Sequence, residues 1–201
     1  MSQTSSSIAP VATKIMLIRH AEKPTTKPPV QGVNINGNPD NESLIVQGWQ
    51  RAGALAVFFA PSVGPLQNSQ IATPNFVYAS KIEKGSSSER PQETVTPLIQ
   101  KLGTSVTVNF NFKKGKKNEH DVAKSAMACN GVVLICWEHQ DIPNITKWFP
   151  ISPNNPNPVP ATWPGERYDV VWVFDLQSPG TGYWFYPEPQ LLLAGDKSYS
   201  G

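Results

Sequence analysis

The stretch that decides the fold runs from Ile15 to Lys23 and reads IMLIRHAEK. Its first four residues are apolar, and a short apolar run of this kind predicts a buried strand. The run ends abruptly at Arg19 and His20, and Glu22 follows shortly after. Charged side chains at the carboxyl end of a strand lie where open α/β sheets bind their ligands. We therefore expect a buried first strand that ends in an anion-binding site.

The rest of the chain alternates between short strands and helices. Apolar periodicity, prolines and glycines predict these elements in order: strand 14–19, helix 44–60 with Ser43 as N-cap, strand 76–79, helix 90–102, strand 105–110, helix 119–130, strand 131–137, helix 142–149, and a hairpin of strands 168–176 and 182–186. Such alternation predicts an α/β fold, a three-layer α/β/α sandwich. Its sheet should be mixed and mainly parallel, because only the terminal hairpin adds antiparallel pairing.

Composition limits the class of protein. With 201 residues, 39% of them hydrophobic and 16% charged, the chain is expected to form one domain over residues 14–201. Residues 1–13 are rich in Ser and Thr and predict a disordered lead-in with no signal peptide. The net charge of +2 is too small to argue for a nucleic-acid or membrane partner, and the two cysteines fit a reduced, cytoplasmic protein.

Polar side chains follow three of the predicted strands. They are Arg19 and His20 after the first, Ser80 and then Arg90 after the second, and Glu138 and His139 after the strand from residue 131. Parallel strands place their carboxyl ends at one edge of the sheet, so these groups should converge. Two arginines can bind phosphate oxygens bidentately, and a neutral histidine can attack phosphorus. A carboxylic acid could protonate the departing oxygen.

These residues resemble the histidine phosphatase superfamily, which is also called phosphoglycerate mutase-like. The segment RHAEK at 19–23 resembles the Arg-His-Gly motif that opens the family, although Ala21 replaces the usual glycine. The segment SERPQET at 88–94 resembles the second arginine at the start of a helix, and Glu138-His139 resembles the second histidine. The resemblance covers about residues 14–176 and implies a phosphoglycerate mutase-like fold.

The resemblance also implies roles for these side chains. His20 would be the nucleophile that accepts the phosphoryl group, while Arg19, Arg90 and His139 would hold the phosphate. Lys23 would add positive charge to the pocket. Water would then hydrolyse the phosphohistidine, with neither metal nor cofactor required. The implied activity is that of a histidine acid phosphatase-type hydrolase acting on a small phosphorylated substrate.

The proton donor is less clear from the sequence. Glu119 best fits the family's glutamate between the second arginine and the second histidine. Glu22 and Glu138 are alternatives because each adjoins a motif, and both are expected to contribute to substrate binding. No long insertion follows the second strand, which favours a compact phosphatase over a mutase.

Other functions remain open at this stage. The chain could be a phosphohistidine-protein phosphatase in signalling, or a non-catalytic protein that binds a phosphorylated ligand. A metal site built from His20, His139 and Asp141 is disfavoured because the neighbouring arginines would repel a cation. The lysines between residues 113 and 117 predict a solvated loop that steers anions at most. The sequence specifies neither the natural substrate nor the oligomeric state.

Overall fold

The structure is a computed structural model that describes residues 11–115 and 118–199. Most of the predicted disordered lead-in, residues 1–13, lies outside these ranges, and so do Lys116 and Lys117 of the basic run. The last three residues of the predicted lead-in, 11–13, are described, and two of them are bound to the domain. Ala12 is fully buried, and its N–H donates to the Met127 carbonyl. The carbonyl of Thr13 accepts a hydrogen bond from the N–H of Leu176.

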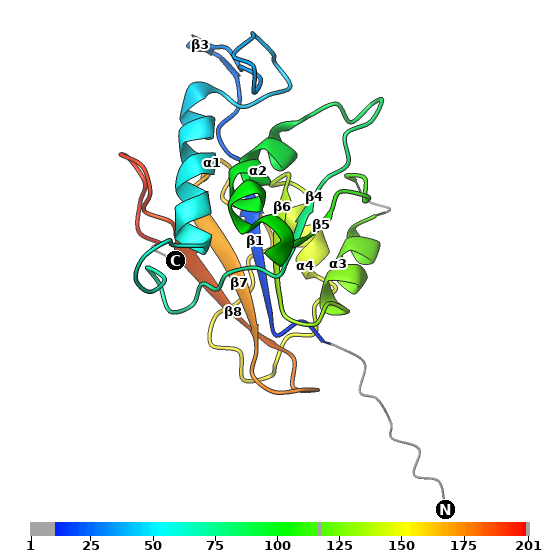
Figure 1. Cartoon of the computed structure of the whole chain (residues 1–201). Coiled ribbons are helices and arrows are strands. Elements are labelled where there is room, and N and C mark those ends of the chain that lie inside the picture. The colour runs from blue at the N-terminus through cyan, green and yellow to red at the C-terminus, as the bar shows by residue number, and fades with distance from the viewer. Residues whose placement is uncertain (1–10, 116–117, 200–201) are drawn as a thin grey trace, which may run out of the picture.

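The centre of the fold is a six-stranded sheet in the order β5-β4-β6-β1-β7-β8. The strands are β1 (Lys14–Arg19), β4 (Phe76–Ala79), β5 (Thr107–Asn109), β6 (Val132–Trp137), β7 (Val170–Leu176) and β8 (Tyr183–Pro189). Pairing is parallel from β5 to β1 and antiparallel between β1, β7 and β8. The predicted mainly parallel mixed sheet with a terminal antiparallel hairpin is therefore confirmed (Figure 1).

Helices cover both faces of the sheet and complete the predicted three layers. Helices α1 (Val46–Phe59) and α2 (Arg90–Leu102) pack on one face, and α3 (Glu119–Met127) and α4 (Ile142–Thr146) pack on the other. A short 3-10 turn, Gly103–Ser105, follows α2. The predicted loop after β1 contains a small hairpin, β2 (Thr25–Thr26) and β3 (Pro29–Val30), which projects from one end of the molecule in Figure 1.

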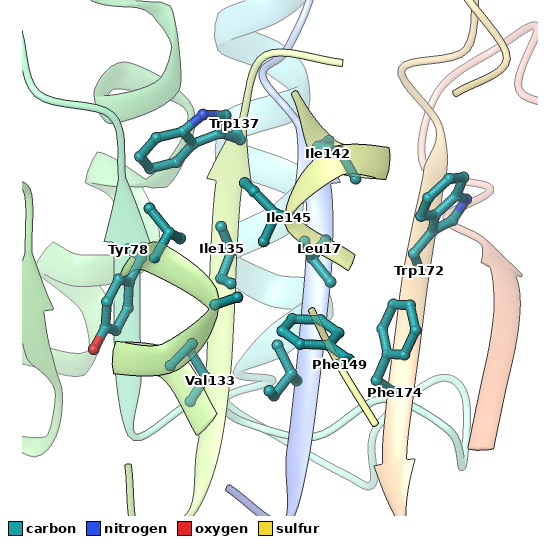
Figure 2. Close-up of a cluster of buried hydrophobic side chains, with 14 of the residues drawn as sticks. Leu17, Tyr78, Val133, Ile135, Trp137, Ile142, Ile145, Phe149, Trp172 and Phe174 are labelled. Carbon is teal, nitrogen blue, oxygen red and sulfur yellow. The ribbon is translucent and has the colours of Figure 1, made fainter. Parts of the chain in front are cut away.

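The strand β1 shows how the sequence produces these layers. Successive side chains of a strand point to opposite faces of a sheet. Ile15 and Leu17 accordingly join the cluster under α3 and α4, whereas Met16 and Ile18 join the cluster under α1 and α2. All four are fully buried. Figure 2 shows Leu17 beside Ile142 and Ile145 of α4, in a cluster that also contains Val133 and Ile135 of β6 and several aromatic side chains.

The start of α1 differs from the prediction. The helix begins at Val46 with Ile45 at the N-cap position, and no side chain caps it. Ser43, the predicted cap, is buried, and its hydroxyl donates instead to Asp40 at 3.1 Å. None of the helices in the described part of the chain combines the length and the apolar character needed to cross a membrane.

Candidate functional site

Strand register brings the first and last of the polar motifs together. Arg19 pairs with Trp137 across β1 and β6, and the N–H of His20 donates to the Trp137 carbonyl at 3.0 Å. Both strands therefore end at the same level. The segment that starts at His20 lies beside the segment that starts at Glu138.

Hydrogen bonds bring the start of α2 to the same edge. The backbone N–H of Ala21 donates to the Thr94 hydroxyl at 2.8 Å, and that hydroxyl donates to the Arg90 carbonyl at 2.7 Å. The Gln92 amide donates to the carbonyl of Ser80, directly after β4, at 3.0 Å. The first turn of α2, with Arg90 at its start, is thus fixed against the segment that contains His20.

The environment of His20 determines its protonation state. Its Nδ1 lies 2.7 Å from the Ala21 carbonyl, which can only accept, so Nδ1 carries the proton and Nε2 keeps a free lone pair. Burial is the main cause that lowers the pKa of His20 to about 3. The positive charges of Arg19, Arg90 and Lys23 act in the same direction. His20 is therefore a neutral imidazole with an available nitrogen at neutral pH.

Arg19 is held by a loop that the sequence did not connect with the site. Its Nη1 donates to the carbonyl of Gly165, and its Nη2 donates to the Tyr168 hydroxyl at 3.1 Å. The guanidinium carbon also lies 3.9 Å from the centroid of the Tyr168 ring, a cation–π contact. Burial lowers the pKa of Arg19, which nonetheless stays charged at neutral pH. No local sequence signal marks Tyr168, which had been assigned only to the start of a strand.

Three motif residues carry buried nitrogens that have no hydrogen-bond partner. In the described part of the chain, seven buried side-chain nitrogen or oxygen atoms lack a partner, and three of them are Arg19 Nε, Arg90 Nε and His139 Nδ1. Arg90 uses only Nη1 for a close contact, donating to the Asn41 carbonyl at 2.9 Å. Buried polar groups are normally paired, so unpaired ones at a single sheet edge indicate a missing acceptor.

Two exposed residues, Lys23 and Glu166, add charge to the site and affect the pKa of His139. Burial and then the positive charges of Arg19 and Lys23 lower the pKa of His139, although Glu138 and Glu166 oppose this. Lys23 is exposed at the rim. Glu166, also exposed, was not singled out from the sequence and lies between Gly165 and Tyr168 in the loop that holds Arg19.

The sequence proposed three glutamates as proton donor, and one of these, Glu22, is tied to a buried arginine. Arg51 donates to Glu22 Oε1 through Nε at 2.9 Å and Nη2 at 2.8 Å. Arg51 also pairs with Asp196 at 2.7 Å and with Gln190 at 2.9 Å. Glu22 therefore belongs to a buried ionic network, which makes it a poor candidate for the proton donor.

The other two glutamates have different partners. Glu138 forms a 2.8 Å ion pair with Lys114. Glu119 is 7% exposed, and its Oε1 accepts a hydrogen bond from the Asn144 amide at 3.0 Å. Asn144 lines a pocket together with His139. Glu119 therefore differs from Glu22 and Glu138. Its hydrogen-bond partner is the neutral amide of Asn144, and that residue lines a pocket.

The described part of the chain contains no side-chain cluster that matches the metal site considered from the sequence. Within residues 11–115 and 118–199, no three His, Cys, Asp or Glu side chains are arranged as ligands of one metal ion. His20, His139 and Asp141 therefore do not form the site considered from the sequence. Asp141 instead accepts a hydrogen bond from the N–H of Gly115 at 3.0 Å.

Comparison with known proteins adds little to this geometry. No family model matches the chain, and no curated protein matches it. Among solved structures, a similar one is the crystal structure of a protein from Agrobacterium tumefaciens assigned by name as the phosphohistidine phosphatase SixA. The TM-score is 0.46 and the sequence identity 14%, over 82% of this chain and 92% of that one. This similarity is too low to support a function, which must be inferred from the side chains.

Proposed function

We propose that this protein is a phosphatase that hydrolyses phosphomonoesters through a phosphohistidine intermediate on His20, without a metal ion. The supporting observation is the set of buried, unpartnered nitrogens on Arg19, Arg90 and His139 beside a neutral imidazole with a free Nε2. A phosphoryl group has the acceptor oxygens that these nitrogens lack, and it has an electrophilic phosphorus for the imidazole to attack. The expected fold and the motifs of the histidine phosphatase superfamily agree with this proposal.

The arginines would bind the phosphoryl oxygens. Each guanidinium keeps Nε–H free for a charge-assisted hydrogen bond, and such bonds are stronger than neutral ones. His139 would add a donor in the neutral tautomer that carries the proton on Nδ1. Lys23 at the rim would increase the attraction for anions. Negative charge that develops on the equatorial oxygens would meet donors already in place, and this lowers the barrier to phosphoryl transfer.

The reaction would proceed in two displacements. The Nε2 lone pair of His20 attacks phosphorus, the bond to the ester oxygen breaks, and the departing oxygen receives a proton from a carboxylic acid. Water then attacks the phosphorus, the P–N bond breaks, and the carboxylate removes a proton from the water. Inorganic phosphate leaves, and His20 returns to its neutral form with the Nδ1 proton retained against Ala21.

We assign the proton donor to Glu119. Glu22 and Glu138, which the sequence also suggested for substrate binding, are each ion-paired with a cation. Each of these carboxylates is thus already held by a cation and is not free to approach a departing oxygen. Glu119 forms no ion pair within residues 11–115 and 118–199, and its hydrogen bond to Asn144 leads towards the pocket at His139.

Hydrolysis of an aryl phosphate tests the proposal. Wild-type protein should hydrolyse it in the presence of a chelator, and His20→Ala should reduce kcat/KM by about a thousandfold or more, as expected for loss of a nucleophile. The matched control is His120→Ala, because the His120 side chain is 50% exposed on α3 and should be dispensable. Circular dichroism would verify that each variant is folded.

Four other outcomes would contradict the proposal. Retained activity in His20→Ala would remove the phosphohistidine mechanism, and loss of activity with chelator would indicate a metal enzyme. Turnover of a phosphohistidine peptide but not of any ester would move the assignment to a phosphohistidine-protein phosphatase. Phosphate binding with no turnover of either would indicate a binding protein.

A further inference from the structure

A pocket opens beside His139, between the start of α4 and the loop before β7. It has a volume of about 340 Å³. It is lined by His139, Gln140, Pro143, Asn144, Ala161, Thr162 and Trp163. This volume is near the lower limit of small-molecule sites, which span about 300–1,000 Å³. The pocket therefore suits a single ring or a short chain.

The lining of this pocket carries no formal charge at neutral pH. Its members are amides, a hydroxyl, apolar groups and His139, which is neutral because burial lowers its pKa. Two charged side chains contact Asn144 of this lining. Glu119 accepts from its amide nitrogen at 3.0 Å, and Lys147 donates to its oxygen at 2.7 Å. These charges are opposite in sign and both are bound to the same amide.

A second pocket is lined partly by residues 166–169 of the loop that holds Arg19, and its lining is charged. It has a volume of about 290 Å³, and its charged lining residues are Glu22, Glu166, Asp169 and Asp196 together with Arg51, Arg167 and Lys197. Among the groups that line this pocket, Glu22 Oε2 is a buried carboxylate oxygen that has no hydrogen-bond partner. That oxygen opposes contact with a phosphoryl oxygen, although three cations also line this pocket. At His139, by contrast, the atom without a partner is a nitrogen that can donate.

We propose that the pocket at His139 holds the leaving group of the substrate, and that this group is small and uncharged. The inference rests on the proposed phosphatase function and narrows its substrate class. Monoesters of small neutral alcohols or phenols fit the site. Bisphosphates and phosphorylated carboxylic acids would place a second anion where no cation lines the wall. Glu119, the proposed proton donor, is bound to Asn144, which lines this pocket.

The test compares two esters of nearly equal shape, 4-carbamoylphenyl phosphate and 4-carboxyphenyl phosphate. The wild type should favour the neutral amide by about tenfold in kcat/KM, which corresponds to about 1.4 kcal/mol. Because the two phenols differ as leaving groups, the decisive quantity is the change in this ratio between wild type and variants. Thr162→Lys places a cation on the pocket wall and should shift the ratio at least fivefold towards the carboxylate.

The matched control is Thr104→Lys, which adds the same charge at an exposed position of the 3-10 turn after α2. It should leave the ratio unchanged. If Thr162→Lys shifts the ratio no more than Thr104→Lys does, the leaving group does not occupy this pocket while the phosphatase proposal stands. Absence of hydrolysis of both esters by the wild type would overturn the phosphatase proposal and this inference with it.

Discussion

The role proposed for His20 requires that its imidazole stay neutral among three nearby cations. The pKa of His20 is lowered from 6.5 to about 3, mainly by burial. Below pH 6.5 the unfolded chain therefore binds a proton at this position before the folded chain does. Protonation then favours unfolding, and the free energy of unfolding falls as pH drops from 6.5 towards 3.

Replacing His20 should remove this pH dependence. Between pH 6.5 and pH 3, the free energy of unfolding should fall more steeply in the wild type than in His20→Asn, by up to about 1.4 kcal/mol per pH unit. Urea unfolding at pH 7, 6, 5 and 4 measures the two slopes. His120→Asn, at an exposed position, should follow the wild type. Parallel slopes for wild type and His20→Asn would mean that His20 titrates normally.

Tyr168 offers a second test at this scale, because it holds Arg19 both by its ring and by its hydroxyl. Cation–π contacts contribute about 0.5–2 kcal/mol, more when desolvated. Tyr168→Phe keeps the ring and should lower kcat/KM for an aryl phosphate about threefold or less. Tyr168→Leu loses the ring as well and should lower it by about tenfold. The two variants should also differ in their inhibition constants for inorganic phosphate, and equal effects would show that the ring does not position Arg19.

A local signal in the sequence predicted which polar groups meet at the sheet edge, whereas the roles of these residues stay predictions. Arg19 and His20 stand out because they interrupt an apolar run, and the polar groups after β1 and β6 do lie side by side. Tyr168 and Gly165 left no such signal, because they contact Arg19 across separations of 149 and 146 residues. The local pattern around Arg19 does not encode which distant loop returns to it.

At the scale of elements, α2, α3 and α4 begin at the predicted residues 90, 119 and 142, whereas α1 begins at Val46 instead of residue 44. The bounds predicted for β1 and β4 match the structure, because each is a short apolar run that ends in a polar residue. The start of α1 was misplaced because Ser43 is a good cap only if its hydroxyl is free. The hydroxyl is used by Asp40, and the N–H of Leu44 donates to Glu93 of α2 at 2.8 Å. Tertiary contacts thus replaced the expected local cap.

The close approach of α1 to the motif segment gives a prediction at this scale. A Cβ on Gly48 would lie 2.6 Å from the backbone oxygen of Glu22. Gly48→Ala should therefore push α1 away from the segment after β1 and destabilise the protein by about 1–3 kcal/mol, the usual cost of overpacking. Activity should fall as well, because Glu22 lies two residues after His20.

Gly53 provides the control within the same helix. It is exposed, and no atom lies within 4 Å of the position that its Cβ would occupy. Gly53→Ala should stabilise the protein by roughly 0.5–1 kcal/mol, because alanine favours the helix over glycine. Thermal unfolding of both variants tests the pair. Similar effects of the two substitutions would show that Gly48 does not determine the spacing between α1 and the site.

At the scale of the whole molecule, a buried ionic network joins segments that are far apart in the chain. Arg51 of α1 contacts Glu22 after β1, Gln190 after β8 and Asp196 in the C-terminal segment. The sequence predicted the layers that bring these segments near one another. It could not predict the network, because each member alone is typical of a solvent-exposed polar or charged residue.

Asp196 closes this network, and its removal gives the last prediction. Burial alone would raise the pKa of Asp196, but hydrogen bonds from Arg51 and from the N–H groups of Leu193 and Leu192 outweigh burial and lower it below 3.8. The carboxylate therefore stabilises the fold at neutral pH, and this contribution is lost as pH falls below 3.8 through the lowered pKa.

Asp196→Ala leaves the buried Arg51 charge with only Glu22 as its anionic partner, and it should cost about 3 kcal/mol at pH 7. Asp121→Ala, whose side chain is 60% exposed, should change stability by less than about 0.5 kcal/mol. Urea unfolding at pH 7 and at pH 3 measures both variants, and the difference between wild type and Asp196→Ala should shrink at the lower pH. A cost below 1 kcal/mol at pH 7 would show that the C-terminal segment does not brace the site through Arg51.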